Sequence, residues 1–234
     1  MTASFIRRLL VIAALGLLSA CNVVLTKDPL FTLKDAAGAP PLRHGVWMFF
    51  KEDDCKVDES KPFTEWPDCA GGGLVSDEDV AGRKANAQPD QLEHMPYVLA
   101  AGDPRIIQIP VDFSLSVQAT ASASGGAEAS ASPPSSATAK PYGYGAVEPV
   151  KLDEQGRIVA FILWPIQCGP PPPKNAKGED TAFATLHPLP GLVMDKDSGV
   201  CTTTSTGALR NAARASKAWA GELRAARWIR DGDR

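Results

Sequence analysis

Apolar residues fill every position of the stretch Ile158-Val159-Ala160-Phe161-Ile162-Leu163-Trp164. An uninterrupted apolar run of this length predicts a β-strand covered on both faces, at the centre of the core. It is preceded by the turn residues Asp153-Glu154-Gln155-Gly156 and, before them, by Tyr142–Leu152. Two β-rich runs separated by a Gly-containing turn predict a hairpin of 142–152 with 157–166.

Other segments have the composition of strands or turns. Gly45–Phe50 is a β-rich apolar run, and Tyr97–Ala101 and Arg105–Val117 are predicted as two further strands. Within the last of these, apolar and polar residues alternate, which predicts one buried and one solvated face. Pro110 has no amide hydrogen to donate, so we expect an edge or a bulge there. Gly71-Gly72-Gly73 is predicted to form a turn.

The C-terminal part is predicted to contain the main helix, over residues 207–226. Its apolar face is expected to dock on the sheet in preference to lying on a membrane, because that face is mostly alanine. Arg227 would break the register, so Trp228-Ile229 is expected to pack separately. A short strand is expected near Val193 or Val200. The face consists of Leu209, Ala212, Ala213, Ser216, Trp219, Ala220 and Leu223.

These elements predict a single α+β domain over residues 43–234, with an antiparallel β-sheet core and a C-terminal amphipathic helix packed on it. Residues 118–140 are nearly all Ala, Ser, Thr, Gly and Pro, and are expected to form a disordered loop. The large aromatic side chains predicted to be buried are those of Trp47, Phe161, Trp164 and Trp219.

The N-terminus has the organisation of an export signal. Arg7 and Arg8 precede an apolar stretch from Leu9 to Leu18, and small residues follow. A membrane-spanning helix needs about 20 apolar residues, so this shorter stretch predicts a cleaved signal. No later segment approaches about 18 consecutive apolar residues, so we expect no second membrane element.

The signal ends in Leu18-Ser19-Ala20-Cys21, which resembles the lipobox of bacterial lipoproteins. The resemblance implies that Cys21 is lipidated, with palmitate among its acyl groups, and that residues 1–20, the signal peptide, are removed. An ordinary secretory signal with a chance cysteine is the alternative. Residues 21–42 contain three prolines and no sustained periodicity, and are expected to form a flexible tether.

With Cys21 lipidated, four cysteines remain, and an even number in an exported protein predicts two disulfides. Of the three possible connectivities we favour Cys55–Cys69 with Cys168–Cys201, because each pair encloses a Pro- or Gly-rich loop. The fold is therefore expected to be stapled by two disulfides. No CxxC or HxxxH spacing occurs, so a zinc site is not predicted.

Shorter motifs loosely resemble uncharacterised envelope lipoproteins of Gram-negative bacteria, a resemblance that implies no known activity. These motifs are Leu42-Arg43 with Gly45-Val46-Trp47, Asp54-Cys55, Trp66-Pro67-Asp68-Cys69-Ala70, and Leu163-Trp164-Pro165 with Cys168. In lipoproteins, Asp after the acylated cysteine is the usual signal for inner-membrane retention. Asn22 stands there in this chain, so the resemblance implies a lipid anchor on the periplasmic face of the outer membrane.

No catalytic constellation is evident, and the catalytic residues stay unknown. The chain lacks a GxSxG motif, and its three histidines, His44, His94 and His187, have no neighbouring residue in the sequence that would orient them. The Asp195-x-Asp197-x-Gly199 spacing fails as a calcium loop, because valine and threonine occupy the sixth and twelfth positions. Neither a metal nor another cofactor is predicted.

The formal net charge of −3, without a basic cluster, argues against nucleic acid as a partner. Two classes of function stay open. The favoured one is a structural or interaction module that binds an envelope protein or a cell-wall component, with the membrane held through the N-terminal lipid. The alternative is a hydrolase that cleaves envelope polymers with carboxylates, which leaves enzyme activity uncertain but less favoured.

Overall fold

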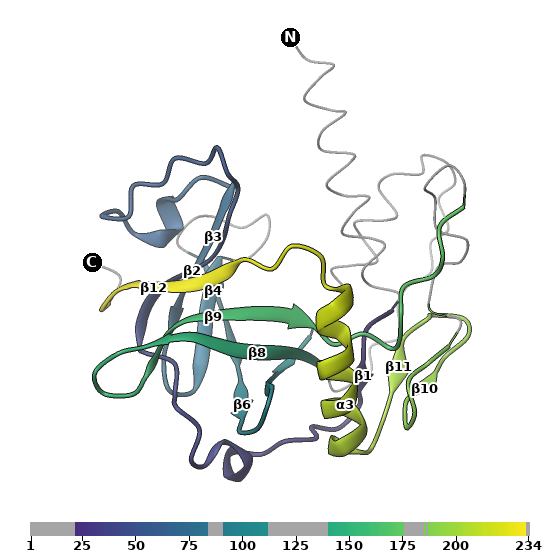
Figure 1. Cartoon of the computed structure of the whole chain (residues 1–234). Helices are drawn as coiled ribbons and strands as arrows, with labels where there is room; N and C mark the ends of the chain where they lie inside the picture. The colour runs from purple at the N-terminus through teal and green to yellow at the C-terminus, as the bar shows by residue number, and fades with distance from the viewer. Residues whose placement is uncertain (1–21, 84–90, 112–139, 176–184, 186, 233–234) are drawn as a thin grey trace, which may run out of the picture.

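The computed structural model describes residues 22–83, 91–111, 140–175, 185 and 187–232. It consists mostly of antiparallel β-sheet with one short helix (Figure 1). The strands of the main sheet are β1 (Leu25–Thr26), β2 (Gly45–Lys51), β3 (Ala70–Val75), β4 (Asp79–Arg83), β5 (Leu92–Pro96), β6 (Val98–Ala100), β7 (Arg105–Pro110), β8 (Tyr142–Leu152), β9 (Ile158–Pro165) and β12 (Ala225–Arg230). A separate pair is formed by β10 (Val193–Met194) and β11 (Cys201–Thr202).

The main sheet follows the order β5-β4-β3-β2-β12-β9-β8-β7-β6, and β1 pairs with β8 outside this path. Strands β2 to β5 pair in chain order, and so do strands β6 to β9. Strand β12 joins the two series by pairing with both β2 and β9. The two ends of the order, β5 and β6, are separated in the chain only by Tyr97. The sheet therefore curls back on itself as a near-barrel.

The first of three apolar clusters fills the inside of the near-barrel. It receives a side chain from nearly every strand around the ring, which is possible only on the concave face. Its buried members are Leu42, Trp47, Val75, Leu99, Val147, Ile158, Phe161 and Ala226, and Trp47 packs against Phe161 at 5.2 Å between ring centroids.

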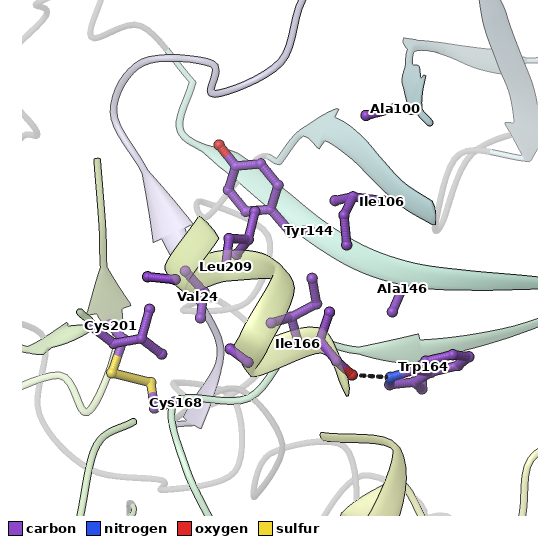
Figure 2. Packing of buried hydrophobic residues seen from close by; sticks show 14 of the residues in the cluster. Val24, Ala100, Ile106, Tyr144, Ala146, Trp164, Ile166, Cys168, Cys201 and Leu209 are labelled. Carbon is purple, nitrogen blue, oxygen red and sulfur yellow. Dashed lines mark hydrogen bonds between the residues drawn. A yellow bond between two sulfur atoms is a disulfide. The ribbon is translucent and has the colours of Figure 1, made fainter. Parts of the chain in front are cut away.

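The second cluster lies on the outer face, between strands β7 to β9 and α3 (Thr206–Ser216). Figure 2 shows Leu209 of α3 among Val24, Tyr144 and Ile166, and the indole of Trp164 donating to a carbonyl of α3. The third cluster covers β2 and β3, where Val46 and Met48 pack beneath Phe63 of the 3₁₀ turn η3 (Phe63–Glu65) and Trp66.

The antiparallel sheet and both disulfides are confirmed, with Cys55 bonded to Cys69 and Cys168 bonded to Cys201. The hairpin of β8 and β9 is also confirmed, with Gly145 opposite Pro165 and Leu152 opposite Ile158. Trp47, Phe161 and Trp164 are buried as predicted. The prediction that β9 is covered on both faces is wrong at Leu163, which is 45% exposed.

The predicted helix over 207–226 is too long. The α-helix ends at Ser216, and a 3₁₀ turn, η4 (Lys217–Trp219), follows it. Residues 225–230 form the strand β12 because a period of two puts Ala226 and Trp228 on the inner face, opposite Phe161 and Trp47. Trp219 is consequently only partly buried, contrary to the prediction.

The prediction of a flexible tether is wrong for residues 22–42, which are packed against the near-barrel. This segment, which we call the strap, includes β1 and the 3₁₀ turn η2 (Leu33–Ala36), and buries Val24, Phe31 and Leu42. Apolar side chains spaced along it find separate places on the sheet, and their burial outweighs the absence of a local period. Figure 1 shows the strap running from β1 beside α3 to the start of β2.

The prediction of a turn at Gly71-Gly72-Gly73 is also wrong, because these residues lie inside β3. A Cβ atom at Gly72 would stand 2.7 Å from the ring of Trp66, so glycine here makes room for the third cluster. The predicted disordered loop at 118–140 lies outside the described residues except for Lys140, and so do residues 112–117 of the strand predicted at 105–117.

Candidate functional site

The first residue that the structure describes, Asn22, is only 8% exposed. Its backbone carbonyl accepts a hydrogen bond from the amide of Cys168 at 2.8 Å, and its side-chain amide donates to the carbonyl of Gly169 at 3.1 Å. Cys21, the residue predicted to be lipidated, is bonded directly to it and lies outside the described residues. The predicted lipid attachment point is therefore next to a fixed residue of the body.

The residue after Asn22 is bonded to the two segments that the Cys168–Cys201 disulfide joins. Val23 forms a bridge with Gln167, and its carbonyl accepts from the amide of Cys201 at 3.0 Å. Cys168 and Cys201 are themselves fully buried (Figure 2). The start of the strap therefore lies between the segment at Cys168 and the segment at Cys201, and the disulfide joins these two segments.

A groove runs along β12 of the near-barrel. Neither α3 nor the loop of residues 52–66 covers β12 completely here, and Ala225 and Arg227 stay exposed. Two hollows of about 440 Å³ and about 820 Å³ meet at Arg227. We call this surface the wall groove. Its further lining includes Phe50, Glu222 and Arg224 in the first hollow and Arg43, Lys151, Ala160 and Trp228 in the second.

The charges of the wall groove are largely paired. Arg227 forms a bidentate ion pair with Glu59, and Arg224 lies 3.2 Å from a carboxylate oxygen of Asp53. The hydrogen bond from Arg227 holds the pKa of Glu59 below its usual range, and the charge of the guanidinium adds to this. The groove is therefore lined by ion-paired charges together with apolar side chains such as those of Phe50, Ala160 and Ala225.

At the other end of the groove, Arg43 stacks on the ring of Trp228 at 3.6 Å from its centroid. Its guanidinium lies 3.7 Å from Asp153 and 3.1 Å from Asp231. Burial alone would raise the pKa of Asp153, but hydrogen bonds and charge from Arg157 outweigh it and lower the pKa. Asp153 is consequently a carboxylate that stays ionised.

Two of the three histidines, for which the sequence offered no orienting neighbour, each pair with an aspartate. His44 Nε2 is 2.7 Å from Asp77, and His94 Nδ1 is 2.6 Å from Asp79. The hydroxyl of Ser76 donates to the same Asp79 carboxylate at 2.6 Å. A serine nucleophile needs an imidazole as the acceptor of its proton, and here the carboxylate takes that place, so this is no catalytic triad.

Asp195, the first residue of the incomplete calcium-type spacing, caps a turn. Its carboxylate accepts from the amides of Asp197 and Ser198, both at 2.9 Å, and the bonds from Ser198 and Asp197 lower its pKa. Among the residues that the structure describes, no group of three or more His, Cys, Asp or Glu side chains is arranged to hold a metal ion. The helices among these residues include none that is long and apolar enough to cross a membrane.

Sequence reasoning missed the wall groove, because its floor belongs to β12. A signal was present: Arg227 breaks the helical register while Ala226 and Trp228 fit a strand. Comparisons of the chain with protein-family models, curated proteins and solved structures give no match.

Proposed function

We propose that this chain is a lipid-anchored protein on the periplasmic face of the outer membrane, where it serves as an interaction module. In this proposal, lipidated Cys21 holds the near-barrel at the membrane, and the wall groove binds an envelope protein or a cell-wall component. The observation that carries the binding role is the wall groove itself, an open surface of apolar and ion-paired side chains.

Two lines of support concern the compartment. Disulfides persist in oxidising compartments such as the periplasm, and this fold has two. The lipobox-like Leu18-Ser19-Ala20-Cys21 supports both export from the cytoplasm and attachment of a lipid. The choice of the outer membrane rests on Asn22, as it does in the sequence resemblance.

The wall groove suits binding better than catalysis. A hydrolase that uses two carboxylates needs one whose pKa is raised, so that it donates a proton at neutral pH. The shifted carboxylates beside the wall groove, Glu59 and Asp153, instead have lowered pKa values and are paired with arginines. Such groups recognise polar partners through fixed charges and hydrogen bonds.

The anchor is tested with Cys21→Ala. Loss of the lipid is expected to release the protein from the membrane fraction or to block signal cleavage, with Cys21-dependent palmitate labelling lost in parallel. Unchanged membrane fractionation of Cys21→Ala would rule out the lipid anchor.

The binding role is tested by photo-cross-linking in intact cells, with the photoreactive residue at Ala225 or Lys151 of the wall groove. The matched control carries it at exposed Thr202 of β11, away from the groove. We expect a discrete adduct from both groove positions and none from Thr202. Adducts that are absent everywhere, or equal at all three positions, would contradict the assignment of the wall groove. Turnover of peptidoglycan fragments by the purified protein, abolished by a single carboxylate substitution, would favour the hydrolase alternative.

A further inference from the structure

The start of the strap fixes how far the body can stand from a lipid on Cys21. Consecutive Cα atoms are about 3.8 Å apart, and the next residue, Asn22, is buried and hydrogen-bonded to the segment at Cys168. A flexible segment of 20 residues would instead give a mean separation of about 25 Å. Because the strap is docked, the body of the protein is held close to the lipid on Cys21.

The surface beside Asn22 is formed by the end of α3. Asn22 and Val23 both contact Gln167, whose backbone amide donates to the hydroxyl of Ser216 at 2.8 Å. Ser216 is the last residue of α3, and η4 follows with exposed Lys217 and Ala218 and partly exposed Trp219. Trp219 therefore lies near the anchor.

Trp219 differs from the other tryptophans of the chain, all five of which belong to the described residues. Each of the other four donates its indole N–H to a backbone carbonyl; these are Trp47, Trp66, Trp164 and Trp228. Trp219 makes no such bond within the described part of the chain, and its ring is partly exposed. An amphipathic indole with a free N–H suits the headgroup region of a bilayer, where one side is apolar and the other hydrated.

We infer that the near-barrel rests directly on the lipid surface, with the end of α3 and Trp219 in the headgroup region. This inference rests on the proposed anchor at Cys21. It also sets the orientation of the molecule. β8 runs from Tyr142, opposite Thr26 of the strap, to Leu152, which is about 30 Å away at the strand rise of 3.3 Å per residue. Figure 1 shows the β8–β9 turn at the end of the hairpin away from β1 and α3, so we expect this turn to lie farther from the membrane.

The test uses the full lipidated chain in phosphatidylethanolamine–phosphatidylglycerol vesicles that contain brominated lipids, which quench nearby tryptophans. We expect the tryptophan fluorescence to be quenched, and Trp219→Phe to lose most of that quenching. The matched control is Trp228→Phe on β12, which is expected to keep it. A second control inserts a flexible Gly/Ser segment of 20 residues between Cys21 and Asn22, which keeps the anchor but is expected to abolish the quenching.

The outcomes separate the two proposals. Palmitate labelling that is absent from Cys21 would overturn the anchor and this orientation together. Labelling that is present, with quenching that is absent or equal in Trp219→Phe and the wild type, would overturn the orientation and leave the anchor standing. Quenching that survives the inserted segment would show that the contact does not depend on the docked strap, and would overturn the inference that the strap holds the body on the lipid.

Discussion

Trp164 and Trp219 both lie close to α3, but they differ in burial and hydrogen bonding. The indole of Trp164 is buried on β9 and donates to the carbonyl of Ala213 at 2.8 Å, so it fastens the helix to the sheet. We expect Trp164→Ala to lower the free energy of unfolding by about 3–5 kcal/mol, from lost packing and an unsatisfied carbonyl. Trp219→Ala is expected to cost about 1 kcal/mol, because its ring is only partly buried. Urea unfolding measures both, and equal losses would contradict this division.

Tyr97, the single residue between β5 and β6, has a phenol that the fold shields. Burial, with the charges of Asp77 and Asp79, raises its pKa to about 12. The stabilisation from the neutral phenol is fully present below pH 10, the ordinary pKa of tyrosine. It is lost as the pH rises through the pKa of about 12 in the folded state. Burial also raises the pKa of Tyr144, so absorbance at alkaline pH is expected to show late-titrating tyrosines, one of which is missing in Tyr97→Phe. A Tyr97→Phe titration identical to that of the wild type would contradict the shift.

At the scale of elements, the strap is held to the sheet by Gln108 of β7. Its side-chain carbonyl accepts from the amides of Leu30 and Phe31 at 2.8 and 2.9 Å, and its amide donates to the carbonyl of Phe31 at 3.0 Å. Gln108→Leu leaves these groups without partners, so we expect a loss of about 3 kcal/mol and faster proteolysis within the strap. Gln155→Ala in the β8–β9 turn is the control, with a change within about 0.5 kcal/mol.

The ion pair of Arg227 with Glu59 is one of the contacts between β12 and the loop of residues 52–66. Because the pKa of Glu59 is lowered, its stabilisation is present above the ordinary value of 4.5 and is lost as the pH falls through the folded value. Glu59→Gln is expected to cost about 0.2–1 kcal/mol at neutral pH and to flatten the acid side of the stability profile. Glu154→Gln, on the β8–β9 turn, is the control. A wild-type acid profile in Glu59→Gln would count against this contribution.

At the scale of the whole molecule, the two disulfides are expected to contribute unequally. They close loops of 14 and 33 residues, for which chain entropy gives about 3 and about 4 kcal/mol. Replacing Cys168 and Cys201 by alanine is also expected to loosen the start of the strap, because both segments bond to it. Thermal unfolding and limited proteolysis of the strap compare this variant with the Cys55–Cys69 pair. Greater damage from replacing Cys55 and Cys69 would contradict this ranking.

The sequence predicted those features that depend on neighbours along the chain. The β8–β9 hairpin follows from two β-rich runs with a short turn between them. The pairing of the cysteines follows from the loops that they enclose, and the burial of Trp47, Phe161 and Trp164 from the apolar runs that contain them. Lipidation of Cys21 stays a prediction.

Only the tertiary structure decided the remaining features, since they depend on residues far apart in the sequence. Residues 225–230 became a strand because β2 and β9 offer a hydrogen-bonding edge on each side. The strap is ordered because the sheet supplies apolar surface and the polar partner Gln108, neither of which is encoded within residues 22–42. The wall groove exists because β12 joins the two halves of the near-barrel. Neither α3 nor the loop of residues 52–66 covers this strand completely. Local patterns specify segments, but burial and pairing across the sheet decide how those segments are used.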